Sequence, residues 1–164
     1  MHLPRLNFAA ALLLSSTLFF TTACGSKEDE PKPEPTLYER MGGLKGVEGF
    51  VDVLMANVAA EASAQNSSML RTHTPLLTDP DKPARLARLR NNFINQIGEA
   101  TGGPLKYTGM TMLSAHKGMM ITEKEWSVWR QAADASMAAN NLGAKEKAEI
   151  AKILDDMKDA TVGH

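Results

Sequence analysis

The spacing of apolar residues is the feature that most limits the folds this chain can adopt. After residue 36 that spacing is helical over much of the sequence. Between Leu44 and Glu61 the apolar side chains recur three and four positions apart, which places them on one helix face. They are Val47, Phe50, Val51, Leu54, Met55 and Val58. No alternation of apolar and polar residues is long enough to predict a strand. The sequence therefore predicts an all-α domain.

Helix boundaries are predicted from the same spacing and from breaker residues. Gly42-Gly43 separates a short first turn from the long helix, and Thr122 and Glu125 have the spacing of a capping box. The expected helical ranges are about 38–41, 44–61, 83–101, 108–118, 123–141 and 144–160. Residues 62–81 are polar and contain two Thr-Pro or Asp-Pro steps, so this segment is expected to be an irregular crossing.

Residues 1–24 have the pattern of an export signal. Arg5 precedes a short apolar run from Phe8 to Phe20, which is too short to span a membrane comfortably. The following residues, through Cys24 and Gly25, resemble the lipobox of bacterial lipoproteins, although a threonine replaces its usual leucine. The resemblance implies lipidation of Cys24 and a protein that faces the periplasm at a membrane. An ordinary cleaved signal peptide with an incidental cysteine is the alternative.

The mature chain is predicted to be a tether followed by one domain. Residues 25–36 are charged and rich in proline, so they cannot bury apolar area and are expected to be extended. The domain is expected at 37–164. The formal net charge of −1 offers no basic surface for nucleic acid. The single cysteine excludes an internal disulfide framework.

A glycine-rich segment with one histidine is the most specific motif. Its residues are Gly102-Gly103-Pro104, Tyr107, Gly109, Met112, His116, Gly118 and Ile121. The pattern predicts a histidine on the apolar side of a short helix, between glycine breaks. No Cys, Asp, Glu or His lies at zinc-ligand spacing from it. One protein ligand in apolar surroundings suits haem, because the porphyrin fills the equatorial positions of the iron.

This motif, together with Tyr38 and Gly42-Gly43, resembles the pattern of group I truncated haemoglobins over roughly residues 36–162. The resemblance implies a two-over-two helical sandwich around a haem pocket that includes Tyr107 and Met112. It also implies that His116 is the proximal ligand of the iron. Because no Cys-x-x-Cys-His motif is present, the expected cofactor is non-covalent haem b.

The opposite, distal side departs from that family. Its members often carry a tyrosine and a glutamine that stabilise oxygen, and Met55 and Phe93 occupy those positions here. A thioether and a phenyl ring cannot donate hydrogen bonds. We therefore expect an apolar distal pocket formed by Met55, Leu89, Phe93 and Ile97.

The sixth position of the iron is left open by the sequence. The iron is five-coordinate, or His73 binds it, or Met55 binds it. His73, or Leu76 with Leu77, is expected to fold over the haem from the crossing segment. The cations expected to meet the haem propionates are Arg85, Arg88, Lys106 and Lys117.

The function implied by the resemblance is binding of small diatomic ligands, such as oxygen or nitric oxide, by a carrier, scavenger or sensor. One alternative is a redox enzyme, either a nitric oxide dioxygenase or peroxidase-like, with an unidentified electron donor. Another is a globin-like binding module without haem. The sequence leaves open whether the protein is an enzyme, and it favours a ligand-binding haem protein.

The lipid anchor can be tested directly. Cys24→Ser removes the only thiol and is expected to move the protein from the membrane fraction to the soluble fraction. The measurement is fractionation of expressing bacteria followed by immunoblotting. Continued membrane association of the variant would count against lipidation.

Overall fold

The computed structural model describes residues 32–164, and there the all-α prediction is confirmed. The chain divides at residue 33, and residues 34–164 form the helical unit. The predicted export signal, Cys24 and most of the tether lie outside the described residues. Within these residues, no helix combines the length and apolar character that crossing a membrane requires.

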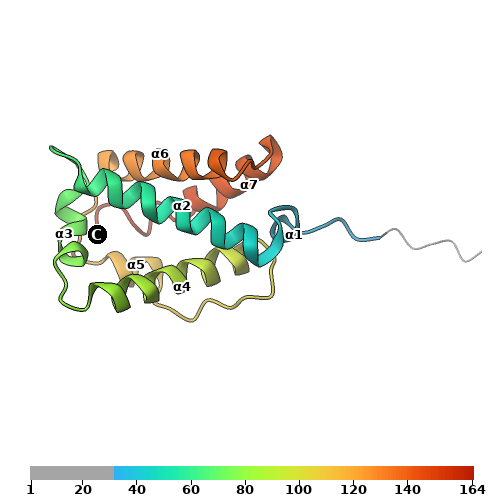
Figure 1. The fold of residues 1–164 in the computed structure, drawn as a ribbon, viewed down its shortest axis with the longest axis horizontal. Coiled ribbons are helices and arrows are strands. Elements are labelled where there is room, and N and C mark those ends of the chain that lie inside the picture. The colour runs from blue at the N-terminus through green and yellow to red at the C-terminus, as the bar shows by residue number, and fades with distance from the viewer. Residues whose placement is uncertain (1–31) are drawn as a thin grey trace, which may run out of the picture. The chain divides into compact units, whose positions relative to one another are not determined.

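Seven helices make up the described part of the chain. They are α1 (Leu37–Arg40), α2 (Gly43–Ser63), α3 (Leu70–Leu77), α4 (Lys82–Ala100), α5 (Met112–His116), α6 (Glu123–Ala139) and α7 (Ala144–Asp155). Helix α2 runs between α6 and α4 and packs most extensively against these two (Figure 1). At one end of the domain, α3 connects α2 to α4 (Figure 1).

The core is built on the N-terminal half of α2. Val47, Phe50 and Val51 are completely buried there, as their helical spacing predicts. The partners come from four other helices and are Leu37 of α1, Ile94 and Ile97 of α4, Ala133 and Met137 of α6, and Ile150 and Leu154 of α7. The apolar faces of these core helices therefore meet in one cluster.

Capping boxes fix the beginnings of two helices. Thr36 and Glu39 cap α1, and the predicted box of Thr122 and Glu125 caps α6. In both, the threonine side chain accepts from a backbone N–H while the glutamate accepts from the cap residue's N–H. Two of the free N–H groups at each helix start are thereby satisfied.

The prediction of an irregular segment at 62–81 is wrong in part, because it contains α3. Pro75 lies inside this helix, where it removes a backbone donor, and no α3 side chain is fully buried. The sequence therefore lacks the usual helix signals. Threonine hydroxyls of the segment donate to carbonyls one turn earlier, as Thr74 does to the oxygen of Leu70 at 2.7 Å.

Two helices are shorter than predicted. Helix α5 covers only Met112–His116, and α7 ends at Asp155 rather than near residue 160. The chain after α7 turns back toward the segment that follows α5. Gly163 N donates to the oxygen of Ile121 at 2.9 Å, and Ile121 and Val162 form an isolated parallel bridge. Between α7 and this bridge, local turn hydrogen bonds replace the last turns of the predicted helix, as Lys158 N donates to the oxygen of Asp155 at 3.0 Å.

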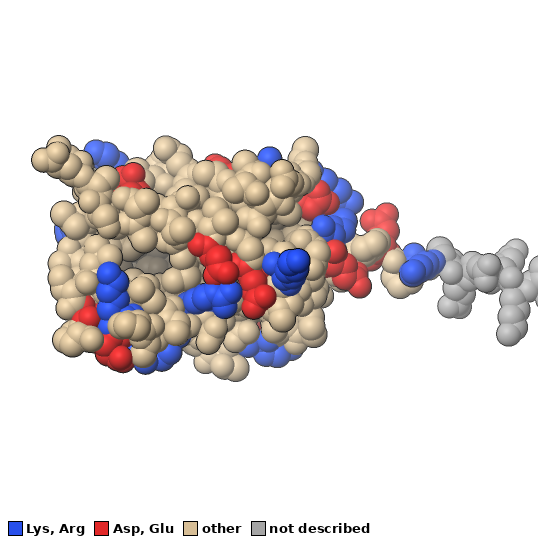
Figure 2. Space-filling view, viewed as in Figure 1, with Lys and Arg blue, Asp and Glu red and all other residues tan. Residues whose placement is uncertain are grey.

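Charged side chains of both signs lie together over α2 and α4 (Figure 2). Arg90 of α4 pairs there with Asp52 and Glu48 of α2. This arrangement joins the two helices along their solvent side. Each exposed pair contributes about 0–1 kcal/mol, so the buried core remains the main source of cohesion.

Gly46 tests the close packing at the start of α2. A Cβ at this position would lie 1.8 Å from the carbonyl oxygen of Met41, which is backbone and cannot move aside. Gly46→Ala is expected to destabilise the domain by about 1–3 kcal/mol, as overpacking does. Urea unfolding followed by circular dichroism measures this.

Gly49→Ala in the same helix is the matched control. Its Cβ would meet only the side-chain oxygen of Asn140, the end of a flexible group. Alanine is also the better helix former by about 1 kcal/mol. A loss of stability equal to that of Gly46→Ala would contradict the argument from the backbone contact.

Candidate functional site

A large cavity lies at the end of the domain that the core leaves unfilled. Its volume is about 1160 Å³, and residues of α2 to α6 line it together with the chain after α7. A hollow opens on the face between α2 and α4, beside α3 (Figure 2). Pockets for small molecules and cofactors are about 300–1,000 Å³ and mostly apolar. The cavity therefore has room for a cofactor-sized apolar molecule.

His116 lies on this cavity at the end of α5. Its Nδ1 is 2.8 Å from the carbonyl oxygen of Met112, one turn earlier in the helix. A carbonyl oxygen can only accept, so Nδ1 carries the proton and Nε2 presents a lone pair. Metal-binding histidines usually have this outer hydrogen bond, which orients the ring. His116 therefore has the chemistry of a metal ligand through Nε2.

The other residues expected on the His116 side also line the cavity. Met112 lies in α5, and Tyr107 lies in the loop before it. The Tyr107 hydroxyl donates to the carbonyl oxygen of Met110 at 2.6 Å. Gly109 permits this fold, because a Cβ there would lie 2.6 Å from the Tyr107 ring. The Tyr107 ring thus lines the cavity, while its hydroxyl proton is donated to the Met110 carbonyl.

The predicted distal residues divide into two groups. Met55, Leu89 and Phe93 line the cavity as expected. Ile97 was expected with them, but it is completely buried in the core cluster and does not line the cavity. Leu76 and Leu77 of α3 also line it. The structure therefore brings together three of the four predicted distal residues and the two leucines that were expected from the crossing segment.

The wall is less apolar than the sequence suggests. Asn92 and Gln96 of α4 also line the cavity, and the Gln96 amide donates to the Met157 sulfur at 3.8 Å. Neither residue is among those predicted from the sequence. Their spacing from Leu89, three and seven positions, is the helical signal that could have found them. The cavity thus contains amide donors near its apolar wall.

His73 of α3 lines the same cavity as His116. Its Nδ1 is 2.9 Å from the carbonyl oxygen of Met69, again one turn earlier in its own helix. The Thr72 hydroxyl is close to the same nitrogen, at 3.1 Å, and itself donates to the Met69 oxygen. The two cavity histidines therefore have the same protonated nitrogen.

Arg71 ties α3 to the segment after His116. Its guanidinium donates to the carbonyl oxygens of Met119 and Met120, at 2.6 and 3.0 Å. It also donates to both carboxylate oxygens of Glu125, at 2.9 and 3.0 Å. Burial favours a raised pKa of the Glu125 carboxyl, but hydrogen bonds from Thr122 and Arg71 outweigh it and hold the pKa below its usual range.

Cations at the cavity differ from those predicted. Of the four expected, only Arg85 lines it, and its guanidinium is paired with Asp79 at 2.7 Å. Arg88 and Lys106 pair with Asp81 and Glu99 elsewhere, and Lys117 is exposed away from the lining. Lys82 lines the cavity and was missed, although it lies one helical turn before Arg85. No acidic side chain in the described part of the chain pairs with it.

Three aromatic rings form a continuous part of the wall. Trp126 and Trp129 are stacked with centroids 5.2 Å apart, and Phe93 meets Trp129 edge-on at 6.3 Å. All three line the cavity. Both tryptophans of the chain are therefore close to any molecule that fills it.

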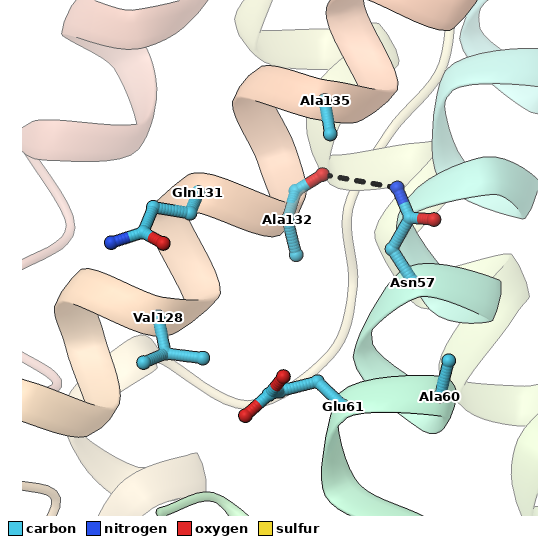
Figure 3. Close-up of a pocket in the computed structure, with 7 residues that line it drawn as sticks. All are labelled: Asn57, Ala60, Glu61, Val128, Gln131, Ala132 and Ala135. Atoms are coloured by element: carbon cyan, nitrogen blue, oxygen red, sulfur yellow. Dashed lines mark hydrogen bonds between the residues drawn. The ribbon is translucent and has the colours of Figure 1, made fainter. Parts of the chain in front are cut away.

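A smaller pocket of about 390 Å³ lies between α2 and α6, away from the histidines. Alanine side chains form much of it, and Asn57 donates across it to the carbonyl oxygen of Ala132 at 3.3 Å (Figure 3). Among residues 32–164, no group of three or more His, Cys, Asp or Glu could hold a bare metal ion. The histidine cavity is therefore the candidate site.

The tie between Arg71 and Glu125 predicts a pH dependence. The pKa of Glu125 is lowered from 4.5 by folding, so its stabilisation is complete above that pH and is lost as the pH falls through the folded pKa. Glu125→Gln is expected to lower the free energy of unfolding at pH 7 by about 1–3 kcal/mol, because hydrogen bonds to a charged group are lost. Below pH 4.5 the difference from the wild type should shrink.

Glu123→Gln is the control, because this exposed glutamate pairs with Lys158 at the surface and with no other cation of residues 32–164. Urea unfolding of the three proteins from pH 7 to pH 3 measures the effect. A Glu125→Gln penalty that is the same at every pH would contradict the assignment.

Comparison with known proteins agrees with this architecture. Residues 36–162 match the bacterial-like globin family. The chain is 25% identical over 125 residues to a group 1 truncated hemoglobin from Nostoc sp., which covers 76% of this chain and 95% of that protein.

Solved structures of truncated hemoglobins share the fold. One from Tetrahymena pyriformis, in its Fe(III) form, has a TM-score of 0.65 at 21% identity and covers 79% of this chain and 100% of its own. A group II truncated hemoglobin from Bacillus anthracis has a TM-score of 0.61 at 19% identity and covers 80% of this chain and 93% of its own. The domain therefore has the all-helical truncated globin fold, and the chain belongs to the bacterial-like globin family.

Proposed function

We propose that the histidine cavity binds haem b non-covalently, with His116 as the proximal ligand, and that the protein binds small diatomic ligands such as oxygen or nitric oxide. The observation that carries the proposal is the orientation of His116. Its Nδ1 proton is held by the Met112 carbonyl, which leaves the Nε2 lone pair for a metal. The bacterial-like globin family and the truncated hemoglobin relative support the same cofactor.

The residues present fit a haem. The cavity is of cofactor size, and its wall is largely apolar with three aromatic rings. His116 supplies one protein ligand, which suffices where a porphyrin supplies the other four. Lys82 is a cation on the lining that is suited to a propionate, and Arg85 is a second. Since the only cysteine is Cys24, the domain of residues 37–164 has no thiol for covalent attachment.

A bound haem would supply an iron atom able to take a diatomic ligand, with His116 holding it. The chain's own residues determine the surroundings of that ligand. Met55 and Phe93 line the cavity with apolar side chains that donate no hydrogen bond. Gln96 carries an amide donor on the same wall, where it now contacts the Met157 sulfur. Loss of that weak contact would free the amide for a polar ligand.

We further propose that this globin is of the group I type and works in the bacterial cell envelope. Assignment to group I rests on the motif from Gly102 to Ile121 and on the similarity to the group 1 relative. The envelope location rests on the export signal and the lipobox-like Cys24. An exported haem protein of this kind would act as a carrier, scavenger or sensor.

Loading the full chain with haemin tests the proposal. We expect a Soret band and, because both tryptophans line the cavity, loss of most of the tryptophan emission. His116→Ala should weaken haemin binding by more than the roughly 10- to 100-fold that loss of an outer-shell partner costs. Absorption and fluorescence titrations measure both.

His164→Ala is the matched control, because this exposed histidine lies at the C-terminus and bonds to the carbonyl oxygen of Asp159. A free tryptophan derivative corrects for light absorbed by haemin. The haem assignment fails if no Soret band forms. The ligand assignment fails if His116→Ala binds haemin like the wild type.

A further inference from the structure

We propose that His73 of α3 is the second axial ligand of the iron, so that the resting protein has bis-histidine coordination by His116 and His73. This inference rests on the haem proposed above. It decides among three states that the sequence leaves open, which are a five-coordinate iron, a His73 ligand and a Met55 ligand.

The first support is the shared chemistry of the two histidines. Both line the cavity, and both place Nδ1 within 2.9 Å of the carbonyl oxygen one turn earlier. Because each carbonyl can only accept, both rings are protonated at Nδ1. Each Nε2, the ring nitrogen farther from the backbone, then carries a lone pair. This is the usual state of a metal-binding imidazole, with its outer N–H bonded to a carbonyl.

The same proton position excludes a common alternative role for His73. A distal histidine that stabilises a bound gas must donate a hydrogen bond through Nε2. In His73 the ring proton is on Nδ1 and is already given to Met69. Nε2 can therefore only accept or coordinate.

The second support is that the two histidine segments are fixed to each other. Arg71 lies two residues before His73, and Met119 lies three residues after His116. The Arg71 guanidinium joins these segments through the carbonyl oxygens of Met119 and Met120, and it reaches α6 through Glu125. Hydrogen bonds thus hold the start of α3 against the segment that follows α5.

Met55 is the weaker candidate. It lies on α2, which the core holds in place. Its flexible thioether side chain is one of several methionine side chains that line the cavity. No hydrogen bond orients its sulfur among the contacts of the described residues. His73, by contrast, has a ring that is already oriented. Coordination forms an iron–nitrogen bond and releases no proton, because Nε2 carries none.

The test uses the full chain loaded with haemin and follows the spin state by absorption and electron paramagnetic resonance. We expect the wild type to be low-spin. His73→Ala should keep the Soret band and become high-spin, and added imidazole should restore the low-spin spectrum. His164→Ala, as the control, should resemble the wild type.

Binding of carbon monoxide to the reduced protein provides a second readout. Apparent affinity falls in proportion to the fraction of protein that is free to bind. If His73 occupies the iron in roughly nine molecules of ten, its removal should tighten carbon monoxide binding by about tenfold. His73→Gln keeps a hydrogen-bond donor for the Met69 carbonyl and should show the same change from low-spin to high-spin as His73→Ala. This variant controls for unfolding of α3 in the alanine variant.

The possible results separate the two proposals. A Soret band with a high-spin wild type, or with a low-spin His73→Ala protein, overturns the His73 assignment and leaves the haem proposal intact. If Met55→Leu alone abolishes the low-spin state, Met55 is the ligand and the assignment is also overturned. Absence of any Soret band overturns the haem proposal itself.

Discussion

The packing of α2 against α4 and α6 is the interaction on which the rest of the domain depends. In its N-terminal half α2 buries Val47, Phe50 and Val51, and in its C-terminal half it lines the cavity with Met55 and Val58. Core and cavity therefore share one helix. Burial of the core positions the cavity wall, although side chains do not fill the cavity itself.

Two short helices complete the cavity, and burial holds them little beyond Met69 at the start of α3. Helices α3 and α5 have no fully buried side chain, and helices of this length are unstable alone. Local hydrogen bonds begin α5, where Thr111 caps the N–H of Ser114. Arg71 anchors α3 to the chain after α5 and to α6. The histidines thus lie on elements that polar contacts position, next to a wall that apolar packing positions.

Methionine gives this wall an adaptable surface. Six of the ten methionines of the chain line the cavity, and they are Met55, Met69, Met110, Met112, Met119 and Met157. Unbranched thioether side chains fit irregular or flat partners with little strain. The stacked tryptophans add a rigid aromatic part. A flat apolar cofactor is well suited to a wall of this composition.

The sequence by itself determined every helix of the described part except α3, the capping box at Thr122 and the histidine motif, because these depend on neighbours within one or two helical turns. The tertiary structure alone decided that Ile97 belongs to the core while Gln96 faces the cavity. Adjacent residues on a helix point about 100° apart, and helical spacing does not say which side meets which partner. The same holds for α3 and for Arg71, whose contacts join residues 48 to 54 positions apart. Such contacts exist only after the chain has folded, because they depend on where other helices have packed.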